Sequence, residues 1–378
     1  MKIGIISRSD LNNKLFWSGV PSNIYSSLKK NKTTKIVRID KLNENLRKLF
    51  AIKREYLKVF RDIKFDETYN TIVSKNYASQ IEKRLKNISN ISHLLTFDSS
   101  LVSHLKTDIP IILWTDILYS DYYQHYFKKQ KISKSSLNDI KSIEFNAIKK
   151  CKIIFFSSKW ALNKAKRKYK KFQKKIKLLE FGPILEEQVQ EKKIKQFIIK
   201  RNHKKIKLIS LSVDWKRKGL EKQIKLTNYL NQKGFKSELT IIGYKPKYNK
   251  IKSNIKFLGF IDKNNKFGER KISSELLKSH FHLLFSKAEA YGLALIEASS
   301  RGVPNISFYV GGIPHLVSNS KNGRLFKKNE KINKIGDYII SVFKNKSKYR
   351  KLAISSYFEY KKRFNNQKII SDFIQLIK

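Results

Sequence analysis

The stretch SKAEAYGLALIEASSRGVPNISFYVGGIPHLVSNSKNGRLF, residues 286–326, decides the fold of this 378-residue chain. The apolar run HFHLLFS (280–286) overlaps its start and predicts a buried strand. GLALIEASSR (292–301) then predicts a helix, closed by a glycine and a proline, and PNISFY (304–309) predicts the next strand. A strand, a helix and a second strand in this order are typical of an α/β unit in a parallel sheet.

The start of this helix has the residues of an anion site. Gly292 allows close approach to the backbone, and we expect free amides from there through Leu293 and Ala294 to residue 295 to attract a phosphate. Glu289 precedes the turn, and Glu297 follows it by 297 − 289 = 8 positions. Carboxylates beside a phosphate site are natural partners for sugar hydroxyls. Two glutamates at this interval are also common by chance, and the spacing alone leaves that alternative open.

In its context, the motif resembles one found in the glycosyltransferases of the GT-B fold, specifically the large retaining family four. EAYGLALIEASSRGVP (289–304) is similar to the family's paired-glutamate motif, with seven residues between the acids and a Gly-x-Pro turn after them. The resemblance implies that Glu289 contacts the transferred sugar and that Glu297 contacts the nucleotide ribose.

Two neighbouring motifs extend the resemblance. VGGIPHLV (310–317) is similar to the family's glycine pair beside the donor, which assigns Gly311 and Gly312 to the donor site. NGRLF (322–326) resembles the turn that follows. The sequence departs from the family at His315, where many members have an acid.

A second basic motif lies in LSVDWKRKGLEKQ (211–223), where a strand ends and a helix begins after a glycine. It resembles the family segment whose lysine binds the donor diphosphate, which implies that role for Lys218. Val213 stands where the family commonly has an arginine, and Arg217 is the expected substitute. The alternative is an ordinary basic loop in a chain rich in lysine.

The first half of the chain offers acceptor-side candidates. The loop after the first predicted strand holds Trp17, Ser18 and Gly19, and a glycine loop here lines the cleft in the family. A core position is the competing interpretation for Trp17. Asp116 follows the strand IPIILW (109–114), and its Thr-Asp pair resembles a family subset. The resemblance implies an acceptor-side catalytic role for Asp116, and a loop cap is the alternative.

Strand-like and helix-like stretches alternate along the whole chain, which predicts an α/β protein with two facing Rossmann-like domains and a central cleft. We expect an acceptor-binding domain at 1–190, a donor-binding domain at 191–355, and a C-terminal helix at 356–378 that packs back on the first domain. Within the first domain, the spacing over 135–150 predicts a helix capped by Ser135 or Ser136.

Composition limits the class of protein further. Lysine and arginine number 82 against 30 acids, which gives a net charge of +52. AT-rich codon usage, an anionic membrane face, an acidic acceptor and nucleic acid are the possible causes; no nucleic-acid motif is present, so we expect no nucleic-acid partner. One cysteine, no signal peptide and no apolar run of about 18 residues predict a cytoplasmic protein, at most peripheral on the membrane.

The sequence therefore predicts a retaining glycosyltransferase of the hexosyltransferase type. It would move a sugar from a UDP- or GDP-sugar to a glycan or lipid-linked acceptor in cell-envelope polysaccharide synthesis. We expect no cofactor and no metal, since the chain lacks an Asp-x-Asp triplet and its histidines are scattered. The alternative is a protein that binds an anionic polymer or nucleic acid on a degenerate glycosyltransferase scaffold.

Overall fold

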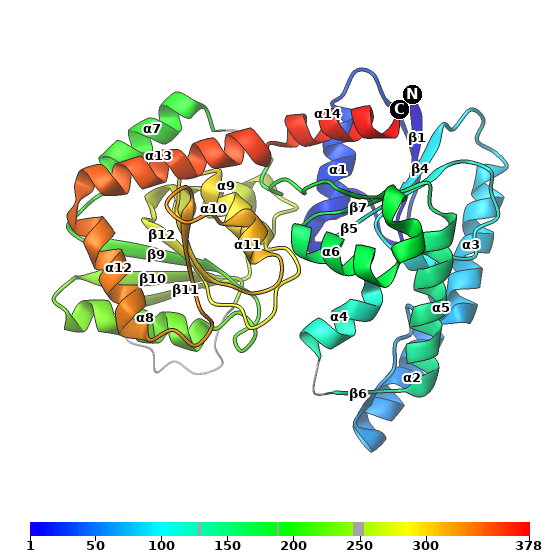
Figure 1. The fold of residues 1–378 in the computed structure, drawn as a ribbon, viewed down its shortest axis with the longest axis horizontal. Helices are drawn as coiled ribbons and strands as arrows, with labels where there is room; N and C mark the ends of the chain where they lie inside the picture. Colours follow the sequence, from blue (N-terminus) through cyan, green and yellow to red (C-terminus); the bar gives the residue numbers. More distant parts are fainter. Residues whose placement is uncertain (128–129, 187–188, 245–252) are drawn as a thin grey trace. The chain divides into compact units, whose positions relative to one another are not determined.

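The computed structural model describes residues 1–127, 130–186, 189–244 and 253–378. These residues form two compact units, one of Met1–Glu180 with Ile370–Lys378, and one of Phe181–Ile369 (Figure 1). Each unit has its own sheet and its own core, and the predicted boundary at residue 190 lies inside the second unit.

The elements of the first unit are, in chain order, β1 (Lys2–Ile6), the 3-10 turn η1 (Phe16–Gly19), α1 (Val20–Lys29), β2 (Lys35–Ile39), α2 (Asn45–Arg61), β3 (Ile63–Lys64), α3 (Thr71–Leu85), β4 (His93–Thr96), η2 (Ser99–Leu101), β5 (Ile111–Thr115), α4 (Tyr119–Tyr126), β6 (Lys131–Ile132), α5 (Lys134–Lys150), β7 (Ile153–Phe156), α6 (Lys159–Lys168), η3 (Lys170–Lys175), β8 (Ile176–Leu178) and most of α14 (Asn366–Ile377). Six strands form one parallel sheet in the order β2-β1-β4-β5-β7-β8. The short strands β3 and β6 pair separately.

The core of the first unit forms because its strands are almost wholly apolar. All five residues of β5 are buried, as expected for a strand covered on both faces. Trp114 in that strand stacks on Phe373 of α14 with ring centroids 5.2 Å apart, and its Nε1 donates to Leu179 O at 2.9 Å. The C-terminal helix is therefore part of the core of the first unit.

The elements of the second unit are α7 (Glu191–Lys200), β9 (Ile206–Leu211), α8 (Leu220–Gln232), β10 (Ser237–Ile242), β11 (Ile255–Gly259), α9 (Lys266–Lys278), β12 (Phe281–Leu284), α10 (Leu293–Ser299), β13 (Asn305–Phe308), α11 (Ile313–Leu316), β14 (Gly323–Phe326), α12 (Ile332–Lys344) and α13 (Lys346–Arg363). Its parallel sheet has the order β11-β10-β9-β12-β13-β14. Strand order reverses between β9 and β12, and ligands in such sheets bind beyond the carboxyl ends of the strands at that point.

Alternate side chains of β9 pack on opposite faces of this second sheet. Ile206 and Leu208 pack in the cluster that also holds side chains of α8 and α12, whereas Ile209 packs in the cluster with α9 and α10. Both faces are covered, so the sheet is a buried α/β sheet. This is the α/β architecture that the sequence predicts for both halves of the chain.

Two local predictions need correction. Helix α5 is capped by Ser133, whose hydroxyl accepts from Ser136 N at 3.2 Å, so the predicted caps at Ser135 and Ser136 are wrong. NGRLF contains strand β14 in place of a turn, since Asn305–Phe308 pairs with it along the whole strand. Between the two sheets, the stretch 181–196 ends in the first turns of α7, and residues 187–188 lie outside the described residues.

Candidate functional site

Two charged side chains meet at the switch point of the second sheet. Lys218 comes from the loop after β9, and Glu289 from the loop after β12. Lys218 Nζ donates to Glu289 Oε2 at 2.5 Å, and Ser286 Oγ donates to the same oxygen at 3.0 Å. The two residues that the sequence assigns to the diphosphate and the sugar are thus in direct contact.

A glycine allows this contact. Gly219 has φ +66°, in the left-handed region, and a Cβ on it would lie 2.3 Å from the backbone oxygen of Phe285. Only a residue without a side chain can bring the β9 loop this close to the end of β12. Lys287 N donates to Arg217 O at 2.7 Å, which fixes the same approach from the other side.

Cations keep Glu289 ionised although the side chain is buried. Burial alone would raise the pKa of Glu289, but the positive charges of Lys218 and Arg217 and two hydrogen bonds outweigh it, and the pKa is lowered from its ordinary value. Arg217 Nη1 lies 3.5 Å from Glu289 Oε2 and its Nε lies 3.3 Å from Asp214 Oδ2. Arg217 therefore stands beside the pair, where the sequence places the substitute for the missing arginine.

The loop after β13 reaches the same place. Gly312 N donates to Glu289 O at 3.0 Å, and Gly311 has a positive φ of 53°. Loops from three neighbouring strands thus converge on Glu289. His315 lies in the short helix α11 that follows, and its backbone oxygen accepts from Arg363 at 2.7 Å.

The start of α10 differs from the prediction. Gly292 caps the helix with φ +111°, but the helix has only seven residues, 293–299. Leu295 N donates to Gly292 O at 2.9 Å, so the prediction of a free amide at residue 295 is wrong. Leu293 and Ala294 are half-buried on the first turn.

Glu297 lies in α10 and is buried, with 2% of its side chain exposed. Its Oε1 accepts from Lys263 Nζ at 2.7 Å, and Lys263 keeps 24% exposure. Sequence reasoning missed Lys263. It stands just after β11, at the ligand edge of the sheet, and this position was the available signal. Glu289 and Glu297 thus each have a lysine partner.

The N-terminal candidates lie at the carboxyl ends of two strands of the first sheet. Trp17 and Ser18 have φ values of 46° and 55°, and Gly19 has 83°, so three successive residues are left-handed. Trp17 is half-buried against Phe97, with ring centroids 5.9 Å apart. Asp116 follows β5 and is half-buried; β4 lies between β1 and β5 in the sheet.

Arg8, which the sequence did not single out, is the central cation of this edge of the first unit. Its Nε donates to Asp98 Oδ2 at 3.0 Å, and its Nη1 lies 3.6 Å from Glu44 Oε1. Burial would lower the pKa of Arg8, but these carboxylates raise it. Arg8 is the first charged residue after the first strand, and this position in the sequence could have identified it.

The buried histidine of β12, His282, has a partner in the core. His282 Nδ1 lies 2.8 Å from Asn305 Oδ1, and burial lowers the pKa of His282 to about 4. Among the residues that the structure describes, no group of three or more His, Cys, Asp or Glu side chains could hold a metal ion.

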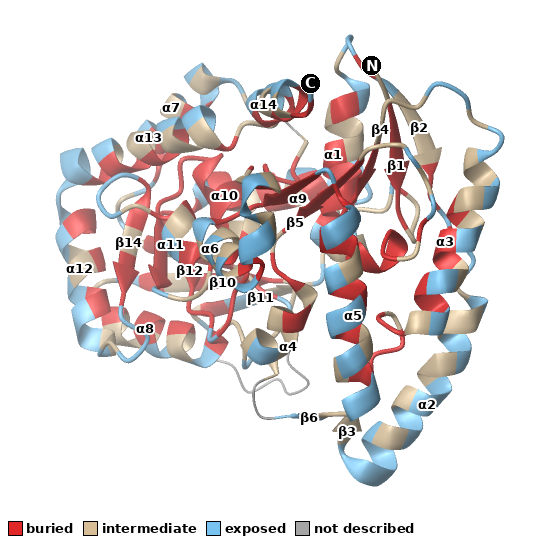
Figure 2. Ribbon diagram, turned by 45° about the vertical axis from the view of Figure 1, so that its right-hand side comes forward, coloured by how far each residue is buried: buried red, intermediate tan, exposed pale blue. Residues whose placement is uncertain are grey.

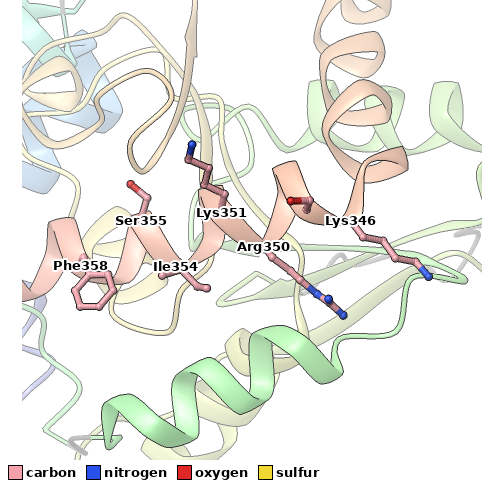
Figure 3. A pocket seen from close by; sticks show the side chains of 7 residues that line it. Lys346, Arg350, Lys351, Ile354, Ser355 and Phe358 are labelled. Carbon is pink, nitrogen blue, oxygen red and sulfur yellow. The ribbon is translucent and has the colours of Figure 1, made fainter.

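A groove of about 820 Å³ runs along α13, lined by Lys346, Ser347, Arg350, Lys351, Ile354, Ser355 and Phe358 (Figure 3). None of the predicted donor residues lines it. Arg350 Nη2 donates to Ile199 O at 3.2 Å, which links the groove to α7. It is therefore separate from the Lys218–Glu289 site.

Most of the second unit matches a known protein family. Residues 191–357 match the family model described as "Glycosyl transferases group 1". N-acetyl-alpha-D-glucosaminyl L-malate synthase of Bacillus anthracis is 29% identical over 138 residues, a stretch that covers 36% of this chain and 36% of that protein. The matched stretch thus spans about a third of that relative.

Solved structures resemble the whole chain. Sucrose-phosphate synthase from Thermosynechococcus elongatus superposes with a TM-score of 0.67 at 13% identity, over 100% of this chain and 98% of that one. WaaG, a glycosyltransferase involved in lipopolysaccharide biosynthesis, gives a TM-score of 0.62 at 12% identity over 99% of both chains. These likenesses confirm the predicted GT-B fold.

Proposed function

We propose that this chain transfers a hexosyl group from a nucleotide-diphosphate sugar with retention of configuration, because residues 191–357 match the model of the glycosyl transferases group 1 family. The donor would be a UDP- or GDP-sugar, and the reaction would need neither a metal nor a further cofactor. The observation that carries the proposal is the contact between Lys218 and Glu289 at the switch point of the second sheet.

The chemical problem in such a transfer is the departing diphosphate, which gains negative charge as the anomeric carbon becomes cationic. Lys218, with Arg217 beside it, would stabilise that charge in place of a metal. Preorganised groups of this kind are typically worth about 3 kcal/mol each in the transition state. Amides at Gly292, Leu293 and Ala294 would assist.

Each glutamate would hold hydroxyls of the donor. Glu289, kept ionised by its cations, would accept hydrogen bonds from the transferred sugar. Glu297 would accept from the ribose, and Gly311 and Gly312 would let the donor approach the backbone. Because Lys263 Nζ donates to Glu297 Oε1, we propose that Lys263 stays paired with that oxygen while the ribose donates to the other carboxylate oxygen.

The first unit would bind the acceptor. Trp17, Ser18 and Gly19 form a left-handed turn after β1, a backbone state that persists only when its surroundings enforce it. We propose that this turn contacts the acceptor and that Asp116, at the end of β5, serves as an acceptor-side polar group.

A glycan or lipid-linked acceptor in cell-envelope synthesis fits the relatives best. WaaG takes part in lipopolysaccharide biosynthesis, and a net charge of +52 favours an acidic acceptor or an acidic membrane face. The name of the B. anthracis relative contains L-malate, so small carboxylic acids should also be tested as acceptors.

A screen of nucleotide sugars tests the proposal. The purified chain is incubated with UDP- and GDP-sugars in EDTA, without an acceptor, and release of the nucleoside diphosphate is followed. We expect slow hydrolysis of one donor, faster release when its acceptor is added, and no loss in EDTA. Binding of nucleic acid with no turnover of any sugar nucleotide would favour the scaffold-only alternative.

A further inference from the structure

The helix α2 of the first unit has an unusual surface. We propose that its outward face is a docking surface for an anionic lipid bilayer. This inference does not depend on the donor chemistry, since α2 belongs to the first unit and the Lys218–Glu289 site to the second. Figure 2 shows α2 with exposed and intermediate residues and no buried ones.

Large apolar side chains line the outward face of α2. About 3.6 residues per turn put positions spaced 3, 4, 3 and 1 apart on an arc of about 100°. The members of this apolar stripe and their exposed fractions are Leu49 (61%), Ile52 (70%), Tyr56 (53%), Val59 (70%) and Phe60 (72%). The ring centroids of Tyr56 and Phe60 lie 5.1 Å apart, so these two members of the stripe are in contact.

The stripe is not the core face of the helix. The core face is formed by other residues of the helix. Leu46 and Phe50 pack against the core of the first unit, and Phe50 stacks on Phe65 with ring centroids 6.3 Å apart. Arg54 is held by Glu67 on the same side. The helix thus has one apolar strip for its own domain and a second one that faces outward.

Charge identifies the partner. α2 carries one acid, Glu55, and six cations, which are Arg47, Lys48, Lys53, Arg54, Lys58 and Arg61. Lys48 and Lys53 are exposed and lie on opposite borders of the apolar stripe. An apolar strip bordered by lysines is the pattern of a helix that lies in the plane of an anionic membrane surface.

A bilayer fits this surface better than a second copy of the chain. A symmetric pair would place the same lysines of both copies around one interface, and like charges there repel. The helix lies on the membrane and does not cross it, since none of the described helices is long and apolar enough to span one.

A matched pair of substitutions tests the proposal in the full chain. Phe60→Glu with Ile52→Glu puts two acids in the stripe, whereas Phe267→Glu with Phe197→Glu makes the same change at exposed phenylalanines of α9 and α7, 80% and 43% exposed. Binding is measured by sedimentation with phosphatidylcholine vesicles, with and without 30% phosphatidylglycerol added, at low and high salt.

We expect the natural chain and the control to bind anionic vesicles at least tenfold better than neutral ones, and high salt to weaken this binding. The α2 variant should bind at least tenfold more weakly than the control. Equal binding by both variants, or equal binding of the natural chain to neutral and anionic vesicles, would overturn the proposal. So would a dimer in ultracentrifugation that Phe60→Glu abolishes, with vesicle binding unchanged.

A second measurement does not rely on loss of binding. In Phe60→Cys, a polarity-sensitive, thiol-reactive dye labels the new cysteine. Cys151 does not compete for the dye, because it is buried and burial raises its pKa to about 12. We expect the dye emission to shift to the blue with anionic vesicles, whereas a dye at Phe267→Cys stays unchanged. Identical responses at the two positions would contradict insertion of α2.

Discussion

Lys218 Nζ and Glu289 Oε2 lie 2.5 Å apart although the residues are 71 positions apart in the chain. Their side chains keep 12% and 10% exposure, so this is a nearly buried ion pair. It joins the ends of the two strands between which the strand order reverses. The pair explains why a carboxylate stays ionised in this buried place, since the cations lower the pKa of Glu289.

The pair predicts a stability effect that a loose surface lysine would not have. Lys218→Met removes the nearer cation of the buried Glu289 and leaves the more distant Arg217, and we expect a loss of about 3 kcal/mol in the free energy of unfolding at pH 7. Lys218→Met with Glu289→Gln removes both charges and should recover most of it. Urea unfolding of the single and double variants measures this; equal stability of the single variant and the natural chain would contradict the pairing.

Gly219→Ala should disrupt the site through the backbone. The new Cβ would meet Phe285 O at 2.3 Å, and we expect about 3 kcal/mol of destabilisation and at least tenfold slower sugar-nucleotide turnover. Gly234→Ala is the control, because Gly234 also has a positive φ, +80°, but nothing within 4 Å of a Cβ. Its cost is about 1 kcal/mol, with turnover unchanged. Similar effects of the two substitutions would remove the close-approach argument.

Lys263→Met tests the role of the second glutamate. The buried Glu297 then loses the cation that pairs with it, and we expect the affinity for the nucleoside diphosphate to fall at least tenfold in calorimetric titration. Lys271→Met is the control, because Lys271 is 43% exposed and pairs with Glu275 at 3.7 Å on the helix surface. Unchanged affinity in Lys263→Met would separate Glu297 from the nucleotide site.

Stability should depend on pH through His282. Its pKa is about 4 in the fold and about 6.5 in the unfolded chain, so the unfolded state takes up a proton first as the pH falls. The contribution of neutral His282 to the free energy of unfolding is therefore complete above pH 6.5. This contribution, about 3 kcal/mol, is lost as the pH falls towards 4. His282→Gln keeps a donor for Asn305 and removes the titration. Its unfolding free energy should fall less than that of the natural chain between pH 7.5 and 4.5; parallel falls would contradict this.

The sequence was sufficient for the architecture because short apolar runs mark buried parallel strands clearly. IPIILW predicts β5, and the glycines after β9 and β12 mark the two loops that meet. The resemblance of their two motifs to the family assigned Lys218 and Glu289 to the same donor site. These features are local in the chain, or depend on a resemblance that covers nearly all of it.

The remaining features depend on tertiary contacts that spacing does not encode. Lys263 is one lysine among many, and only the fold brings it to Glu297, 34 residues away. The Ser133 cap was missed because three serines stand within four residues, and hydrogen-bond geometry selects among them. The stripe on α2 has the spacing of a core face, and only burial shows that it faces outward.

We propose above that Lys218 holds the diphosphate of a sugar nucleotide. Calorimetric titration of the natural chain and Lys218→Met, with the double variant Lys218→Met, Glu289→Gln if the single one is too unstable, tests it with the nucleoside diphosphate and with the bare nucleoside. We predict that affinity for the diphosphate falls at least tenfold in the variant while the weak affinity for the nucleoside stays the same. An equal loss for both ligands, or no loss for either, would contradict the claim.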